Sequence, residues 1–154
     1  MNFLNSLKPV ILLLATLGSS HDKIPVKLLG RWSVGVPYHT PGPIGINAEQ
    51  EKFIRGLYLV YIDDHLQVCG KEISAQPIST KSLTKNEFLQ SYGFLPQVIG
   101  MKSSPVTDLK LNLSNGMNAC GEYQDPGAHL LIDPGGHVVM EVSNDYFPLK
   151  RNKV

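Results

Sequence analysis

One segment, residues 129–142, constrains the fold most strongly, because its alternation of apolar and polar residues defines an antiparallel hairpin. Side chains of a β-strand point to opposite faces with a period of two. A three-residue loop over Pro134-Gly135-Gly136 therefore places the apolar residues of both strands on one face: Leu130, Ile132, Val138, Met140 and Val142. On the other face, the same register forms two mixed pairs: Asp133 with His137, and His129 with Glu141.

These two imidazole–carboxylate pairs have two interpretations. A histidine joined to a carboxylate can form a general-base site or part of a metal site. Such pairs can also face solvent and stabilise the hairpin by ~0.2–1 kcal/mol each. We favour the second interpretation, and we predict no metal site, because the histidines of the chain do not follow a metal-binding spacing.

Other segments predict further strands and two short helices. Residues 57–62 and 66–69 flank Asp63-Asp64-His65 and predict a second hairpin. Additional strands are expected at three places: from Trp32 to Val36, at 72–80 and at 106–113. Helices are expected at 47–55 and 83–92, because each begins with a capping box: Asn47 with Gln50, and Thr84 with Glu87.

The resulting fold class is β-rich α+β. We expect an antiparallel, lipocalin-like sheet or small barrel of about eight short strands, with the two short helices flanking it. Residues 37–45 contain three prolines and two glycines and are expected to form a loop. Whether the interior is filled by side chains or holds a cavity stays open at this point.

The N-terminus has the pattern of a secretory signal peptide. Lys8 supplies a positive charge, residues 9–17 are almost wholly apolar, and the small residues Gly18-Ser19-Ser20 precede a polar segment. The apolar run is about half of the roughly 20 residues that a membrane span needs. We therefore predict a signal peptide at 1–20, one mature domain at 21–154 without a membrane span, and a periplasmic or secreted location. A buried N-terminal helix is the alternative.

Cys69 and Cys120 are the only cysteines. In an oxidising compartment such a pair predicts a disulfide, and both cysteines lie in segments with strand character. Joining residues 51 positions apart restricts the unfolded chain by ~4 kcal/mol in the chain-entropy treatment. Free buried thiols and a metal site are the alternatives, although zinc is disfavoured without a C-x-x-C motif or paired histidines.

The charge of the chain argues against nucleic acid as a partner. The sequence has 14 basic and 13 acidic residues, and its lysines are spread singly. Nucleic-acid binding proteins usually carry a basic stripe, because contacts to phosphate supply much of their affinity. We expect residues 150–153, although basic, to be a solvated terminus.

Motifs for catalysis are sparse. The chain has no G-x-S-x-G nucleophile elbow and no H-E-x-x-H helix, and residues 116–121 lack the lysine of a phosphate-binding loop. A carboxylate pair formed by Glu122 and Glu141 is the remaining enzyme hypothesis. We predict no cofactor, no metal ligands and no assigned catalytic residue, and whether the protein is an enzyme stays open.

Aromatic and titratable residues on predicted strands are the candidates for ligand binding. Strand aromatics more often belong to the core, but they can also line a cavity. The candidate ligand-binding residues are Trp32, Tyr58, Tyr61, Tyr123, His129 and Glu141. Tyr146 and Phe147 share this aromatic character, and residues 37–45 and 117–126 are candidate contact loops for a partner.

The segment Leu28-Leu29-Gly30-Arg31-Trp32 resembles the opening G-x-W motif of lipocalins and other calycin-like barrels, and Asn144-Asp145-Tyr146 resembles the second lipocalin motif. In that superfamily the tryptophan closes one end of an up-and-down barrel. The chain also resembles small exported proteobacterial proteins that begin with L-x-G-x-W. The features it shares with them are Trp32, a helix at 49–55, Cys69, a helical segment at 83–88 and a closing aromatic strand at 145–149. This second resemblance implies a fold and a compartment, but no activity.

Three functions follow as hypotheses. The first is a periplasmic or secreted binding protein for a small apolar molecule or for an envelope or extracellular protein. The second is a small envelope enzyme using carboxylate and histidine chemistry at Glu122, His129 and Glu141. The third is a structural envelope protein without a dedicated ligand. Binding predicts a concave pocket, whereas catalysis predicts convergent titratable groups with perturbed pKa values.

Overall fold

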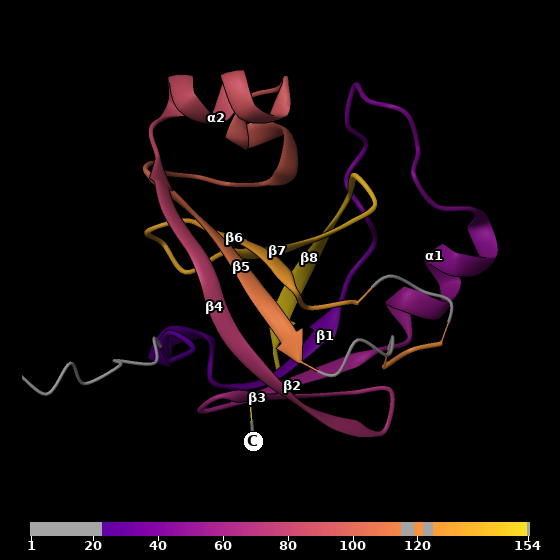
Figure 1. Ribbon diagram of the computed structural model, residues 1–154. Coiled ribbons are helices and arrows are strands. Elements are labelled where there is room, and N and C mark those ends of the chain that lie inside the picture. Colours follow the sequence, from indigo (N-terminus) through magenta and orange to yellow (C-terminus); the bar gives the residue numbers. More distant parts are fainter. Residues whose placement is uncertain (1–22, 115–118, 122–124, 154) are drawn as a thin grey trace, which may run out of the picture.

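The computed structural model describes residues 23–114, 119–121 and 125–153, which form a closed antiparallel barrel of eight strands (Figure 1). Each strand pairs with the next one along the chain, and the last strand pairs with the first. The strands are β1 (Gly30–Val34), β2 (Tyr58–Ile62), β3 (His65–Val68), β4 (Lys71–Leu83), β5 (Val106–Ser114), β6 (His129–Ile132), β7 (Val138–Val142) and β8 (Asp145–Arg151). The helices are α1 (Ala48–Arg55), α2 (Lys85–Tyr92) and the short 3₁₀ turns η1 (Val26–Leu28) and η2 (Pro96–Ile99).

The predicted register of the last hairpin is confirmed. Leu130 pairs with Met140 and Ile132 with Val138, so the apolar residues of β6 and β7 share the inner face. The second hairpin is also present, but its turn is shorter than predicted, because His65 already belongs to β3. Strand β4 is longer than expected, since it pairs with β3 along its first part and with β5 along most of its length.

Both helices begin where their capping boxes predict. The Asn47 side chain accepts from the Gln50 amide, and the Thr84 side chain accepts from the Glu87 amide. The second helix starts after Leu83, because that residue ends β4. None of the helices within the described ranges is long and apolar enough to cross a membrane. The predicted signal peptide at 1–20 lies outside the described residues.

Inward-facing side chains of the strands form one continuous apolar cluster inside the barrel. Its most deeply buried members, each less than 2% exposed, include Leu59, Tyr61, Leu66, Leu109, Leu130, Met140 and Phe147. Helix α1 lies beside the barrel and adds Ile54 to this cluster (Figure 1). Transfer of so many apolar side chains out of water is the main stabilising contribution to the closed sheet.

The segment that leads into β1 meets the last strand at one end of the barrel. The indole N–H of Trp32 donates to the Leu28 carbonyl over 2.7 Å, and the Arg151 guanidinium lies over the indole ring, 4.6 Å from its centroid. Arg151 also donates to the carbonyls of Leu29 and Lys27. The basic residues at 150–153 are largely exposed to solvent, as expected, but Lys150 and Arg151 also extend β8 along β1.

The predicted disulfide joins Cys69 and Cys120, whose Cα atoms lie 5.4 Å apart. The cysteines do not lie in strands, contrary to expectation. Cys69 occupies the tight turn between β3 and β4 with φ at 52°, and Cys120 lies in the connection between β5 and β6. The bond thus ties together two connections rather than two strands.

A second apolar cluster lies on the outer wall of the barrel. Helix α2, η2 and the segment that joins them cover outward-facing residues of four consecutive strands: Val106, Leu131, Val139 and Tyr146. Phe88 and Phe94 form its centre, and their rings meet edge to face. The barrel therefore has one hydrophobic core inside and a smaller one outside.

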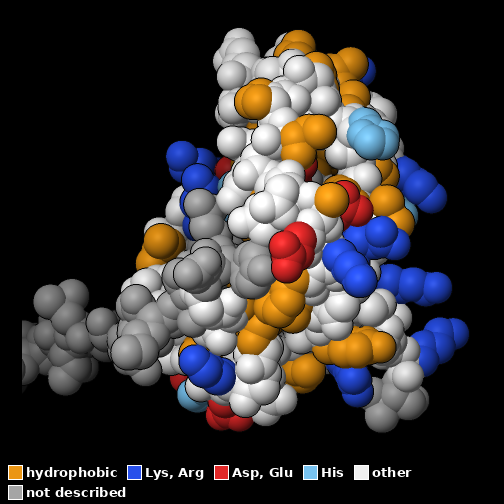
Figure 2. Space-filling model, turned by 90° about the vertical axis from the view of Figure 1, so that its right-hand side faces the viewer, with side chains coloured by type: hydrophobic (Ala, Val, Ile, Leu, Met, Phe, Trp, Pro, Cys, Tyr) orange, Lys and Arg blue, Asp and Glu red, His pale blue; other side chains and the backbone are white. Residues whose placement is uncertain are grey.

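Pairing of the first and last strands brings basic residues from distant sequence positions onto neighbouring strands. Figure 2 shows Lys and Arg side chains along one edge of the face it views, although the sequence spreads them singly. Pairing of β1 with β8 explains part of this grouping, because it brings Lys150 beside the strand that carries Arg31. Barrel closure thus creates a charged edge that the sequence does not show.

We predict that Arg151→Ala lowers the free energy of unfolding by about 1–3 kcal/mol, because the substitution removes the cation–π contact and leaves two carbonyls without their donor. Urea unfolding followed by Trp32 fluorescence measures this loss. Lys150→Ala, on the neighbouring exposed side chain, serves as the control with an expected change under ~0.5 kcal/mol. Equal losses in the two variants would contradict the role of Arg151.

Candidate functional site

The structure separates the predicted ligand-binding residues into different regions. Trp32 and Tyr61 belong to the inner core and are 3% and 1% exposed. The Tyr61 hydroxyl donates to the Gly127 carbonyl over 2.9 Å. Tyr58 lies on the outer surface, half exposed, beneath the Arg31 guanidinium. Tyr123 lies outside the described residues, as do Glu122 and, in all, half of the candidate loop 117–126.

His129 and Glu141 do come together, on the outer wall of the barrel. The Nδ1 atom of His129 lies 2.6 Å from a Glu141 carboxylate oxygen, as the hairpin register predicts. On the opposite edge of the ring, Nε2 lies 2.8 Å from an Asp108 carboxylate oxygen. The other Asp108 oxygen accepts from the Tyr92 hydroxyl over 2.8 Å. This network, Asp108–His129–Glu141 with Tyr92, links β5, β6 and β7 to the end of α2.

The geometry of the network requires His129 to be a cation. A carboxylate only accepts hydrogen bonds, so both ring nitrogens must carry protons and donate. Burial alone would lower the pKa of His129, but the hydrogen bonds and charges of Asp108 and Glu141 outweigh it and raise the pKa to about 9. His129 is therefore an imidazolium ion at neutral pH.

The acidic partners are correspondingly stabilised as anions. Burial opposes this in both, but the hydrogen bonds from His129 and Tyr92 lower the pKa of Asp108, and those from His129 and the Asn144 amide lower the pKa of Glu141. The charge of Lys110 acts in the same direction. Burial and the neighbouring Asp108 raise the pKa of Tyr92, so its hydroxyl remains a donor.

Neither a metal site nor a general base follows from this arrangement. The carboxylates bind opposite edges of the imidazolium, so the ring has no free lone pair for a metal ion or a proton. Across the described residues, no group of three or more His, Cys, Asp or Glu side chains is placed to hold a metal. Titratable groups with shifted pKa values are typical of a functional site. A structural ion network that holds α2 against the barrel would shift the same pKa values, so the shifts alone do not identify a function.

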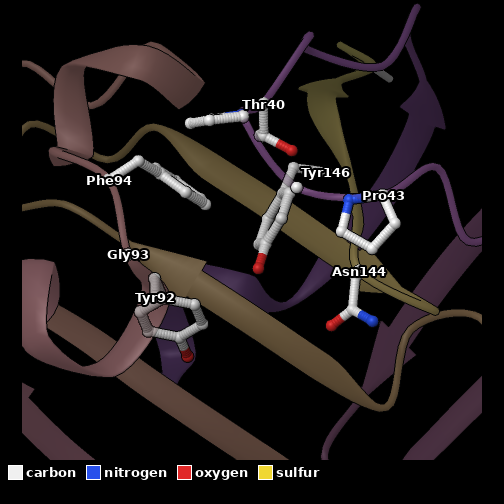
Figure 3. Close-up of a pocket in the computed structure, with 9 residues that line it drawn as sticks. Thr40, Pro43, Tyr92, Gly93, Phe94, Asn144 and Tyr146 are labelled. Carbon is white, nitrogen blue, oxygen red and sulfur yellow. The ribbon is translucent and has the colours of Figure 1, made fainter.

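Two adjoining cavities lie beside this network, with volumes of about 370 and 480 Å³. They share Tyr92, Asn144 and Tyr146, so together they form one hollow that we call the outer groove. Its first part is otherwise lined by Thr40, Pro41, Gly42, Pro43, Gly93 and Phe94, as Figure 3 shows for most of them. Its second part is otherwise lined by Lys81, Leu83, Ser91, Asp108, Lys110, His129 and Glu141.

The wall formed by loop 37–45 is fixed by hydrogen bonds to β8. A carboxylate oxygen of Asp145 accepts from the backbone amides of Gly45 and Ile46 over 2.9 and 3.0 Å. The Tyr38 amide donates to the Tyr146 carbonyl over 2.8 Å. Gly45 allows the loop to approach so closely, because a Cβ atom at this position would lie 1.5 Å from the Ser143 carbonyl oxygen.

The two parts of the groove differ in chemistry. The first part combines polar groups with apolar surfaces: the rings of Phe94 and Tyr146 meet edge to face, and the prolines of loop 37–45 line the same cavity. The second part is polar and carries two lysines beside the Asp108–His129–Glu141 network. A concave site with an apolar wall and a few directed polar groups is the usual form of a small-ligand site.

Sequence reasoning found part of this groove. It identified loop 37–45, His129, Glu141 and, as an aromatic candidate, Tyr146. It missed Asp108, Tyr92, Asn144 and the two lysines. For Asp108 a signal was present, because Val106, Asp108 and Lys110 alternate with the inward-facing residues of the same strand. No sequence signal indicated that α2 would bring Tyr92 to them.

The chain matches no protein-family model, no curated protein and no solved structure. Its function must therefore be argued from the groove itself.

We predict that stability falls as pH rises from about 6.5 to about 9. The folded state raises the pKa of His129 above its ordinary value of 6.5, so its contribution is complete below pH 6.5 and disappears as pH passes the folded value of about 9. The loss should be on the order of 2 kcal/mol. Urea unfolding at a series of pH values measures it.

His129→Gln should remove this pH dependence while lowering stability at pH 6. His65→Gln, which changes a more exposed histidine on β3, should retain it. Persistence of the full slope in His129→Gln would show that another group causes it. A direct NMR titration of the His129 ring should give a pKa near 9.

Proposed function

We propose that this protein is an exported binding protein and that its ligand, or a segment of its partner, occupies the outer groove. The observation that carries this proposal is the pair of adjoining cavities that share Tyr92, Asn144 and Tyr146. Their volumes lie within the range of small-molecule sites, and they combine an apolar wall with directed polar groups.

The groove supports binding better than the barrel interior does. Trp32, Tyr61 and Phe147 fill the inner core and are at most 3% exposed. Because protein cores pack closely, a ligand placed among these side chains would have to displace them. The groove needs no such displacement, and candidate loop 37–45 forms one of its walls. We therefore propose the outer wall, rather than the interior, as the place where a small ligand or a segment of a partner protein binds.

Export is supported by two observations. Residues 1–20 have the pattern of a signal peptide, and Cys69 is bonded to Cys120. Disulfides persist in the periplasm and outside the cell, where reducing systems do not break them. The closed barrel is also the architecture that the resemblance to lipocalin-like exported proteins implies, and we retain that relationship as part of the proposal.

An enzyme function receives less support from the geometry. His129 donates both of its protons to carboxylates, so it offers no lone pair for general-base chemistry. The network instead positions Tyr92 at the centre of the groove. We assign to it the role of holding the groove in shape.

Binding at the groove can be tested by photo-crosslinking in the native envelope. A photoreactive amino acid at Thr40, which lines the groove, should give a covalent adduct with the ligand or partner. The same amino acid at Ile78, an exposed position on β4 that is 67% accessible, is the matched control. We expect the Thr40 adduct to be at least ten times more abundant. Equal labelling at both positions, or none at Thr40, would contradict the proposal.

Export predicts a defined covalent form. Protein purified from its own envelope without reductant should begin near residue 21, and its mass should be lower by two hydrogens than that of the reduced chain. Intact-mass spectrometry with and without reductant measures both. A chain that still begins at Met1 and contains two free thiols would overturn the exported location.

A further inference from the structure

The Tyr146 hydroxyl is a donor without a hydrogen-bond partner among the described residues, and it stays accessible to water in the groove. Tyr146 as a whole is 5% exposed. Figure 3 shows this hydroxyl directed into the groove, between Tyr92 and Asn144. Burial and nearby carboxylates raise the pKa of Tyr146 to about 12, so the group stays protonated. A ligand that supplies an acceptor here would satisfy it.

Two lysines add positive charge to the same cavity. Lys81 is the cross-strand neighbour of Asp108, and Lys110 is that of His129. Within the described part of the chain, neither ammonium group lies within 4.0 Å of a carboxylate. The Asp108 and Glu141 carboxylates already accept from His129, Tyr92 and the Asn144 amide. Three cations (the two lysines and the His129 imidazolium) and two carboxylates line this part of the groove, so its net charge is positive by one.

The remaining lining groups favour a ring with polar substituents. Pro43 and Tyr146 present flat apolar surfaces on adjacent sides of the groove (Figure 3). The Thr40 hydroxyl and the Asn144 side-chain amide lie beside them, and within the described residues neither makes a hydrogen bond. Such groups match hydroxyl substituents, which both donate and accept.

We propose that the outer groove binds a sugar acid, a compact ring that carries hydroxyl groups and one carboxylate. The carboxylate lies by Lys81 and Lys110, the ring lies against Pro43 and Tyr146, and a ring oxygen accepts from the Tyr146 hydroxyl. This inference rests on the proposed binding function and specifies its ligand class. Coulomb attraction at a partly exposed site is modest, so the affinity of a single unit should be weak.

The test uses the folded, disulfide-bonded mature protein and three probes: glucuronate, glucose and acetate, at constant ionic strength. Amide NMR titration should show saturable shifts at Gly93, Phe94 and Asn144 with glucuronate. Glucose should bind at least ten times more weakly, and acetate should give no saturable shift. Equal binding of glucose and glucuronate would overturn the anionic assignment, and equal binding of acetate would overturn the role of the ring.

Variants separate the two recognition elements. Tyr146→Phe removes only an unpartnered hydroxyl, so the fold should persist while the affinity for glucuronate falls five- to tenfold. Lys110→Gln should weaken glucuronate binding by a similar factor without changing the binding of glucose. Lys150→Gln, which removes a lysine outside the groove, is the matched control and should bind as the wild type does. Unchanged affinity in Tyr146→Phe would overturn the proposed contact.

The outcomes also distinguish this inference from the proposed function. A specific crosslink at Thr40 without glucuronate binding would keep the groove as a binding site and overturn the sugar-acid assignment. Absence of both would overturn the groove as a site.

Discussion

Closure of the sheet depends on a small set of contacts between its first and last strands. Strand β8 pairs with β1, and the Arg151 guanidinium covers the Trp32 ring while it donates to carbonyls that precede β1. An open eight-stranded sheet would expose two rows of unpaired backbone groups and its inner apolar face. Pairing of the first and last strands therefore allows the inner apolar face of every strand to be buried.

Closure also places the proposed binding surface outside the barrel. The inner faces of the strands are occupied by large apolar side chains, including Tyr61 and Phe147, which leave polar chemistry to the outer faces. On most of the wall these outer residues face solvent. Between β5 and β8, however, α2 and η2 build a second apolar cluster, and its edge against loop 37–45 forms the outer groove. A helix of only eight residues thus converts a barrel surface into a concave site.

The ion network at this edge shows how a buried charge is tolerated. His129 is partly withdrawn from water, but it lies between two carboxylates and both ring protons have acceptors. Burial of an unpaired charge would be strongly unfavourable, whereas this arrangement satisfies all three groups and orients Tyr92 as well. Because both ring nitrogens already donate to carboxylates, the same hydrogen bonds that stabilise His129 prevent it from acting as a general base. The Tyr146 hydroxyl, which makes no hydrogen bond among the described residues, and the two lysines line the same groove.

The sequence by itself determined the features that depend only on residues close together in the chain. Alternation in residues 129–142 specified the hairpin register and the His129–Glu141 pair, and the side chains of Asn47 and Thr84 specified where both helices begin. Only the tertiary structure decided which groups from distant segments meet. It placed Cys69 and Cys120 in turns, extended β8 to Arg151, and brought Asp108 and Tyr92 to His129. These contacts depend on barrel closure and on the docking of α2, and both follow from burial of apolar surface summed over the whole chain, which no short sequence pattern encodes.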